Sequence, residues 1–183
     1  MKKKIFAIAV LIVCLSLSVG GTLAFFTTSK TARNVIEMGA IEVELVQKGE
    51  GGAPFENAVG VIPGKSVADI VTVKNISVKP CWVRVKADKA IKLAEGVVGV
   101  PDTSLVTLDL NTIDWTLKDG YYYYNNVLAA DAETEPLFTK VTFSTAMGNL
   151  YKNATAEIDV TAQAVQYANN GTTVDQAAGW PSV

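Results

Sequence analysis

Residues 61–87, "VIPGKSVADIVTVKNISVKPCWVRVKA", contain two strand patterns separated by turns, and they decide the class of fold. Pro63 and Gly64 are typical of a tight turn, after which we predict a strand over residues 66–75. In the second pattern every other side chain is apolar or small: Cys81, Val83, Val85 and Ala87. Because successive side chains of a strand point to opposite faces, this alternation predicts one buried and one solvated face, as in antiparallel sheets.

The same alternation recurs along the rest of the chain. It predicts strands in "GAIEVELV" at residues 39–46 and in "ATAEIDVTAQA" at residues 154–164. Further strands are predicted at residues 137–145, 112–117 and 121–128. The last two are joined by Lys118-Asp119-Gly120, in which the Asp-Gly pair indicates a hairpin turn.

Helical periodicity is almost absent from the sequence. Only residues 88–97 and 174–180 are predicted to form short helical turns. About eight short strands separated by turn residues favour an all-β fold, a jelly-roll-like antiparallel β-sandwich with Greek-key or jelly-roll connections. We expect one such domain over residues 39–183.

The first 24 residues are predicted to be a secretory signal peptide. Three lysines are followed by an apolar stretch at residues 5–19 and then by small residues. Thr22 and Ala24 suit the −3 and −1 positions of a signal peptidase, so we place the cut between Ala24 and Phe25. The alternative is an uncleaved anchor, because the apolar stretch extended by a few residues approaches the roughly 20 residues that span a membrane.

Cleavage at this point leaves a moderately acidic chain of 159 residues. It contains 13 Lys and Arg against 18 Asp and Glu, a net charge of about −5. This balance disfavours nucleic acid and anionic membrane surfaces as partners, and we expect contact with a membrane only during export. Cys81 is its single cysteine, so no internal disulfide is expected.

The sequence offers little that is typical of catalysis. It contains no histidine, which removes the commonest general base and the commonest zinc ligand. Cys81 lies on the apolar face of its predicted strand and is expected to be a buried, inert thiol. We therefore predict that the protein is not an enzyme and that it has no catalytic residues, no metal site and no cofactor.

Carboxylates are the remaining candidates for chemistry. In "DAETE", Asp131, Glu133 and Glu135 stand at every second position and could offer oxygens to Ca²⁺. The segment lacks the glycine and the terminal ligand of a defined calcium loop, so a solvated acidic loop is the favoured interpretation. A hydrolase that uses two carboxylates on facing strands, with Asp114 and Asp131 as candidates, is a further alternative.

An aromatic cluster is predicted on the Asp-Gly hairpin. It comprises Trp115, Tyr121, Tyr122, Tyr123 and Tyr124. In a strand two of the four tyrosines point inward and two outward. The outward pair is a candidate for stacking on sugars or for a protein interface.

Four segments resemble the TasA and camelysin (CalY) family, exported proteins of Gram-positive bacteria whose signal peptides are removed by a SipW-type signal peptidase. They are "GGTLAFF" (20–26), "NVIEMGAIEVEL" (34–45), residues 61–87, and the hairpin "WTLKDGYYYYNNVLAADAETEPLF" (115–138). Together they span most of residues 18–166. The chain departs from the family's usual Gly-Thr-Leu-Asp-Leu first strand, since it has Gly-Ala-Ile-Glu-Val at residues 39–43.

The resemblance implies a secreted jelly-roll sandwich, often a subunit of biofilm matrix fibres, in the extracellular matrix or at the cell surface of a Gram-positive bacterium. In such fibres the N-terminal segment that cleavage frees is thought to complete the sheet of a neighbouring subunit. The expected partners are thus copies of the same chain, together with the SipW-type peptidase during export. The donor segment would be residues 25–38, with polymerisation contacts from Phe25, Phe26, Val35, Ile36 and Met38. An unpaired sheet edge is an adhesive site of this kind.

Two other functions stay open at this point. One is a secreted adhesion or binding module that uses the aromatic hairpin, and the other is the carboxylate hydrolase described above. The peptidase activity implied by the name camelysin has no support in a chain without histidine.

Overall fold

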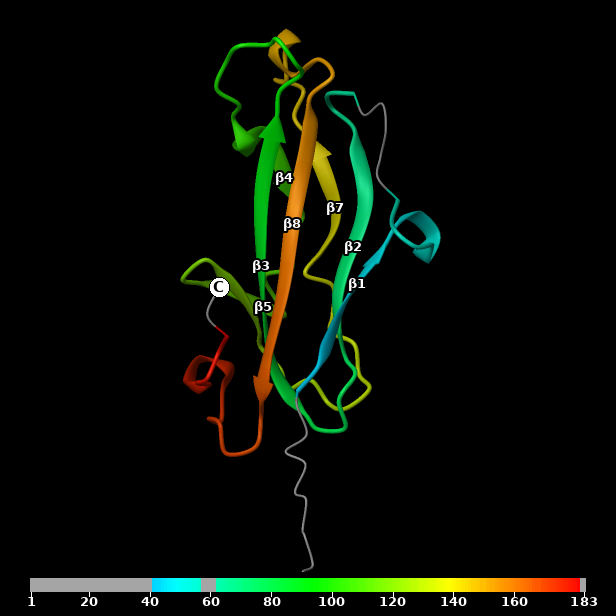
Figure 1. The fold of residues 1–183 in the computed structure, drawn as a ribbon. Helices are drawn as coiled ribbons and strands as arrows, with labels where there is room; N and C mark the ends of the chain where they lie inside the picture. Colours follow the sequence, from blue (N-terminus) through cyan, green and yellow to red (C-terminus); the bar gives the residue numbers. More distant parts are fainter. Residues whose placement is uncertain (1–40, 57–61, 182–183) are drawn as a thin grey trace, which may run out of the picture. The chain divides into compact units, whose positions relative to one another are not determined.

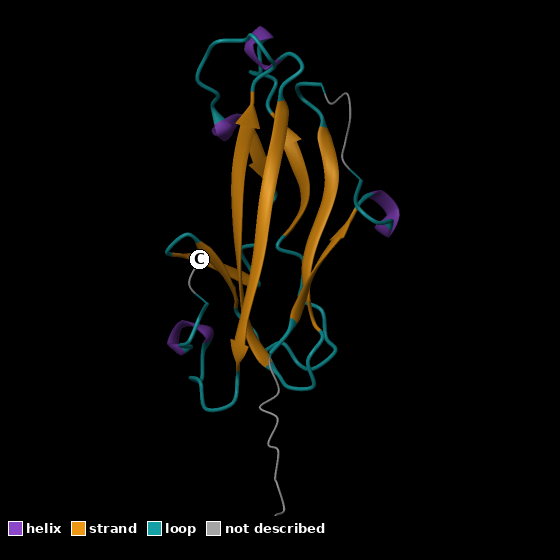
Figure 2. Ribbon diagram, in the orientation of Figure 1, coloured by secondary structure: helices purple, strands orange, loops and turns teal. Residues whose placement is uncertain are grey.

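The computed structural model describes residues 41–56 and 62–181, all of which lie in the unit Met38–Val183. The predicted cleavage site and the predicted donor segment at residues 25–38 fall outside the described residues. The described part is an antiparallel β-sandwich of two four-stranded sheets, which confirms the predicted fold class (Figures 1 and 2). Its only helical segments are four short 3₁₀ turns: η1 (Glu50–Gly52), η2 (Thr103–Leu105), η3 (Asn149–Tyr151) and η4 (Val174–Gln176).

The first sheet has one long strand, β2 (Ser66–Asn75), and the second has two, β3 (Cys81–Lys92) and β8 (Thr155–Gln166). The first sheet has the order β1 (Val43–Lys48), β2, β7 (Phe138–Phe143), β4 (Val106–Leu108). The second has the order β5 (Trp115–Lys118), β6 (Tyr121–Tyr124), β3, β8. Only β1–β2 and β5–β6 follow each other within one sheet, and the other connections cross between sheets, as in Greek-key sandwiches.

The core lies between the sheets and is built from the alternating side chains predicted above. Its completely buried members come from inner strands and the segment before β7: Val71, Val73, Cys81, Val83, Val85, Leu137 and Phe138. Asn75 is also completely buried, and its side-chain amide donates to the carbonyl oxygens of Lys79, Leu128 and Ala129. Because these bonds satisfy the buried amide, Asn75 ties the β2–β3 turn to the chain before β7.

The two ends of the domain are built from different connections. The β2–β3 end holds the turn at residues 76–80, where the Ile76 backbone N–H donates to Glu42 O at 3.1 Å, and where Cys81 pairs with Gln166. The β3–β4 end holds the loop at residues 93–105, whose Asp102 N–H donates to the Tyr151 hydroxyl at 3.0 Å. Figure 1 shows these two groups of segments at opposite ends of the long strands.

The turns predicted from Asp-Gly and Pro-Gly pairs are confirmed. Asp119 and Gly120 connect β5 to β6 with φ of 51° and 79°, the left-handed pair that a two-residue hairpin requires. Gly64 has φ of 83° in the turn before β2. Both signals are local, so the sequence alone is enough to place them.

One local prediction is wrong. Residues 88–92, predicted to begin a short helical turn, are the last part of β3, because the pairing of β3 with β8 continues without a break to Lys92 opposite Thr155. Residues 174–180 contain the short helical turn predicted for them, the 3₁₀ turn η4 over their first three positions. The short strand β4 was not predicted, since three residues carry too little alternation to stand out.

Candidate functional site at the open edge

The strands β1 and β8 lie at the edges of the two sheets on the same side of the sandwich (Figure 1). In the described part of the chain, β8 pairs with β3 alone through all twelve of its residues. Within the same described residues, β1 pairs with β2 and with no other named strand. Each therefore presents a row of backbone N–H and C=O groups along its outer edge.

The inward side chains along this edge are only half-buried. On β8 they are Ala156, Ile158, Val160, Ala162 and Ala164, and at β1 they are Ile41, Val43 and Leu45. All of them pack against the core without being closed off from solvent. We call this side of the sandwich, with β1, β8 and these side chains, the open edge.

Small side chains leave room at the open edge. Three of the five inward residues of β8 are alanines, and a fourth alanine, Ala87, stands beside them on β3 opposite Val160. Proline and inward-pointing charges protect the edge strands of many monomeric proteins, and β8 contains neither; its two charged residues, Glu157 and Asp159, alternate with the inward ones. A long edge strand with an apolar inward face favours pairing with another strand.

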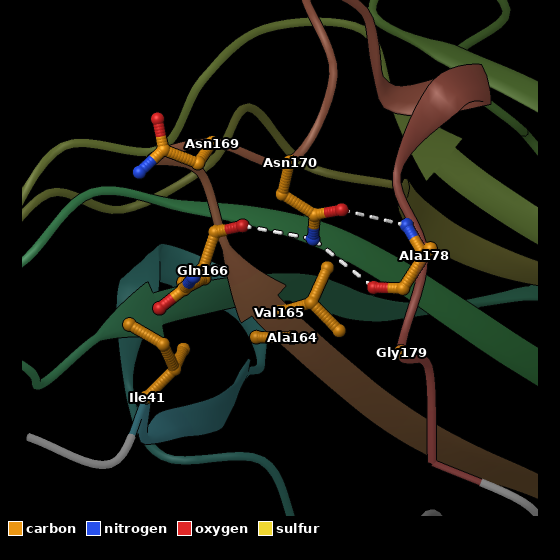
Figure 3. A pocket seen from close by; sticks show the side chains of 8 residues that line it. All are labelled: Ile41, Ala164, Val165, Gln166, Asn169, Asn170, Ala178 and Gly179. Atoms are coloured by element: carbon orange, nitrogen blue, oxygen red, sulfur yellow. Dashed lines mark hydrogen bonds between the residues drawn. The ribbon is translucent and has the colours of Figure 1, made fainter. Parts of the chain in front are cut away.

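A shallow pocket of about 470 Å³ lies at the β2–β3 end of the open edge (Figure 3). Ile41 lines it from the segment just before β1, and Ala164 and Gln166 line it from the end of β8. Asn170 holds its far wall, because its side-chain amide donates to Gln166 O and Ala178 O while its side-chain oxygen accepts from the Ala178 N–H. The pocket thus combines an apolar floor with fixed polar walls.

The predicted aromatic cluster is divided between the two faces of the second sheet, as alternation requires. Trp115 and Tyr124 belong to the core between the sheets, with their ring centroids 5.1 Å apart. Tyr122 packs against the same core and is half-buried. Tyr121 and Tyr123 belong to a second hydrophobic cluster, on the outer face of the sheet, and are therefore the outward pair.

That outer face is covered by the chain's own residues. The Arg84 guanidinium stacks 3.9 Å from the Tyr121 ring centroid and 4.7 Å from that of Trp180, and it donates to Gln163 Oε1 at 2.7 Å. The C-terminal segment is fastened there by the Trp82 indole N–H, which donates to Asn170 O at 3.0 Å. The outward tyrosines are therefore engaged within the domain, and little of their surface is left for a ligand.

Two of the acidic candidates, Glu133 and Asp114, have structural partners. Glu133 accepts from Lys48 Nζ at 2.8 Å and from the Thr72 hydroxyl, and these bonds lower the pKa of its carboxyl. Asp114 accepts from the Asn111 side chain at 2.9 Å. Asp131 is exposed in a turn with φ of 58°. Over residues 41–56 and 62–181, no group of three or more His, Cys, Asp and Glu side chains is placed to hold a metal ion.

One buried carboxyl was missed by the sequence reasoning. Asp69 is 2% exposed, and its Oδ1 has no hydrogen-bond partner in the described structure. Burial raises the pKa of this carboxyl to about 6, although the nearby Gln47 side chain opposes the shift. The alternation of residues 66–75 places Asp69 on the same face as Val71 and Val73, so the pattern itself contains the signal.

Cys81 agrees with its predicted character. The thiol is completely buried, and burial raises its pKa to about 11. A thiol with this pKa is protonated at neutral pH and is a poor nucleophile. It contributes volume to the core.

Comparison with protein families, curated proteins and solved structures finds no match to this chain. Among the helical segments that the structure describes, none is long and apolar enough to cross a membrane. The family resemblance therefore stays a prediction, and the open edge is the feature from which function can be argued.

Proposed function

We propose that the protein is a secreted structural subunit of extracellular fibres, assembled by donor-strand complementation. In this proposal, SipW-type cleavage after Ala24 frees residues 25–38, and this segment pairs with the open edge of the next subunit. The fibre would belong to the biofilm matrix or surface of a Gram-positive bacterium, as the resemblance to the TasA and camelysin family implies. The single observation that carries the proposal is the open edge itself.

The dimensions of the donor segment suit this edge. A strand rises about 3.3 Å per residue, so the twelve residues of β8 extend about 40 Å and the fourteen residues at 25–38 about 45 Å. The apolar residues of the segment stand at its two ends, Phe25 and Phe26 at one and Val35, Ile36 and Met38 at the other. A single segment is thus long enough to cover the whole edge and to place apolar side chains near both of its ends.

The direction of pairing follows from the sheet. Every pairing between the described strands is antiparallel, and antiparallel ladders are slightly more stable per residue than parallel ones. A donor antiparallel to β8 has Phe25 and Phe26 at the β2–β3 end of the acceptor. There the 470 Å³ pocket with Ile41 and Ala164 on its floor is available for an aromatic side chain.

A matched pair of variants tests the proposal. Ala162→Glu places a charge on the half-buried inward face of β8, and Thr161→Glu places the same charge on the exposed face of the neighbouring residue. The mature chain, residues 25–183, is imaged by electron microscopy. We expect filaments from the wild type and from Thr161→Glu, and none from Ala162→Glu.

Thermal unfolding of both variants shows whether each is folded. Filaments of normal appearance from a folded Ala162→Glu chain would contradict strand addition at this edge. A wild-type chain that stays monomeric at all concentrations would contradict the fibre proposal as a whole.

The adhesion alternative has less support. It needs accessible aromatic side chains, whereas Trp115 and Tyr124 lie in the core and Tyr121 and Tyr123 pack against Arg84 and the C-terminal segment. The hydrolase alternative likewise rests on carboxylates that are paired or isolated within the described residues.

A further inference from the structure

Large apolar side chains are exposed at both ends of the domain. In the β3–β4 loop, Val98 is 97% and Val100 is 88% exposed, and Val97 is exposed beside them. In the β2–β3 turn, Val78 is 86% exposed and Ile76 is exposed next to it. Exposing valine and isoleucine side chains to water is unfavourable, and clusters of exposed apolar residues mark interaction surfaces.

The proposed donor strand determines which ends of two subunits meet. The strand β8 runs from the β3–β4 end, where Thr155 pairs with Lys92, to the β2–β3 end, where Gln166 pairs with Cys81. A donor antiparallel to it runs the other way, so its last residue, Met38, emerges at the β3–β4 end of the acceptor. The donor's own domain begins at Ile41, which lies at its β2–β3 end.

The connection between the two domains is short. Only residues 39 and 40 separate the donor segment from Ile41, and each residue extends the chain by at most about 3.6 Å. Met38 of the donor strand is therefore within about 11 Å of Ile41, which holds the β3–β4 end of one subunit near the β2–β3 end of the next. These are the two ends that expose valines.

We propose that the β3–β4 loop of one subunit packs through Val98 and Val100 against Ile76 and Val78 in the β2–β3 turn of the next, as a second contact between copies of this chain. The inference rests on the proposed function, because donor-strand pairing brings these ends together. Glu95 in the loop and Lys79 in the turn are both exposed and give the two surfaces opposite charges. A contact of this kind makes the junction between subunits stiff, because two separate attachments fix the angle that a single strand leaves free.

Exposed aliphatic side chains also occur outside these two segments, and one of them provides a matched control. Ile113 is 86% exposed, the same as Val78, but it stands before β5, outside both the β2–β3 turn and the β3–β4 loop. We expect Val78→Asp and Val100→Asp each to raise the critical concentration for filament formation about tenfold, since each removes one buried valine from the contact. We expect Ile113→Asp to leave it unchanged.

A disulfide test measures the contact directly. Two singly substituted mature chains, Val78→Cys and Val100→Cys, are mixed, assembled and oxidised, and the products are separated by non-reducing electrophoresis. We expect cross-linked dimers from this mixture and none when Ile113→Cys replaces either partner. The native thiol does not interfere, because Cys81 is completely buried.

The outcomes separate this inference from the proposed function. Wild-type filaments, combined with normal assembly of Val78→Asp and Val100→Asp and no cross-link, would overturn the end-to-end contact and leave strand addition intact. Absence of wild-type filaments would overturn both. Sedimentation with phosphatidylglycerol vesicles that is lost in Val100→Asp, while filament formation is unchanged, would assign the loop to a membrane surface and also overturn the contact.

Discussion

The inner strands β2 and β3 and the edge strands β1 and β8 differ in how completely their inward side chains are covered. Val71, Val73, Val83 and Val85 on the inner strands are completely buried, whereas the inward alanines of β8 stay half-buried. Both pairs of strands have the same alternating pattern, so periodicity does not distinguish them. Side-chain size and strand order do, and they separate the completely buried part of the core from the part that stays half-exposed at the edge.

The largest effect on the free energy of unfolding is expected in the completely buried part of the core, its centre. Phe138 is completely buried at the start of β7, so Phe138→Ala leaves a cavity and should lower the free energy of unfolding by about 3–5 kcal/mol. Urea unfolding followed by tryptophan fluorescence measures this loss. A change below about 1 kcal/mol would mean that the centre can collapse around the cavity and is not the rigid part of the domain.

A smaller change, this time an increase in the free energy of unfolding, is expected from replacing Asp69, a buried carboxyl on an inner strand. Because its pKa is raised from 3.8 to about 6, ionisation destabilises the fold progressively as the pH rises from about 4 to 6, and the cost is constant above that range. Asp69→Asn should therefore be more stable than the wild type at pH 8, by about 1–3 kcal/mol.

The pH dependence distinguishes this explanation from a general effect of the substitution. The advantage of Asp69→Asn in thermal unfolding should shrink as the pH falls to 4. An advantage that is the same at pH 4 and pH 8 would show that the carboxyl does not titrate in the folded protein as its burial predicts.

The smallest effect on folding is expected at the open edge. Ile158 is half-buried, so Ile158→Ala should lower the free energy of unfolding by less than about 1.5 kcal/mol. Under the proposed function the same variant should weaken filament assembly several-fold, because the donor strand buries this side chain. A loss of stability as large as that of Phe138→Ala would remove the distinction between centre and edge.

How much could be predicted from the sequence depended on whether the signal is local. The alternation of residues 66–75 and the Asp119-Gly120 turn are local, and both were found. Residues 88–92 were misassigned because their strand is stabilised by β8, some seventy positions away in the chain. Local propensity contains no information about such a partner.

The candidate site was harder to predict than the strands, because it depends on contacts between distant parts of the chain. The residues of β8 were correctly predicted to be a strand, yet nothing in "ATAEIDVTAQA" indicates that it lies at an edge, because strand order depends on the whole topology. The aromatic hairpin had the clearer signal, and alternation predicted that two of its tyrosines point inward and two outward, without saying which. Its outward tyrosines are covered by Arg84 and Trp180, a contact between distant segments that alternation does not reveal.

The buried thiol of Cys81 makes the domain convenient for single-molecule work. The chain that the predicted cleavage would leave contains no other cysteine, and Cys81 is shielded by the core, where burial raises the pKa of its thiol. A cysteine introduced on the surface would thus be the single site that reacts with a maleimide dye at neutral pH. Each subunit would then carry one fluorophore, so the growth of an assembly can be counted subunit by subunit without first removing a native residue.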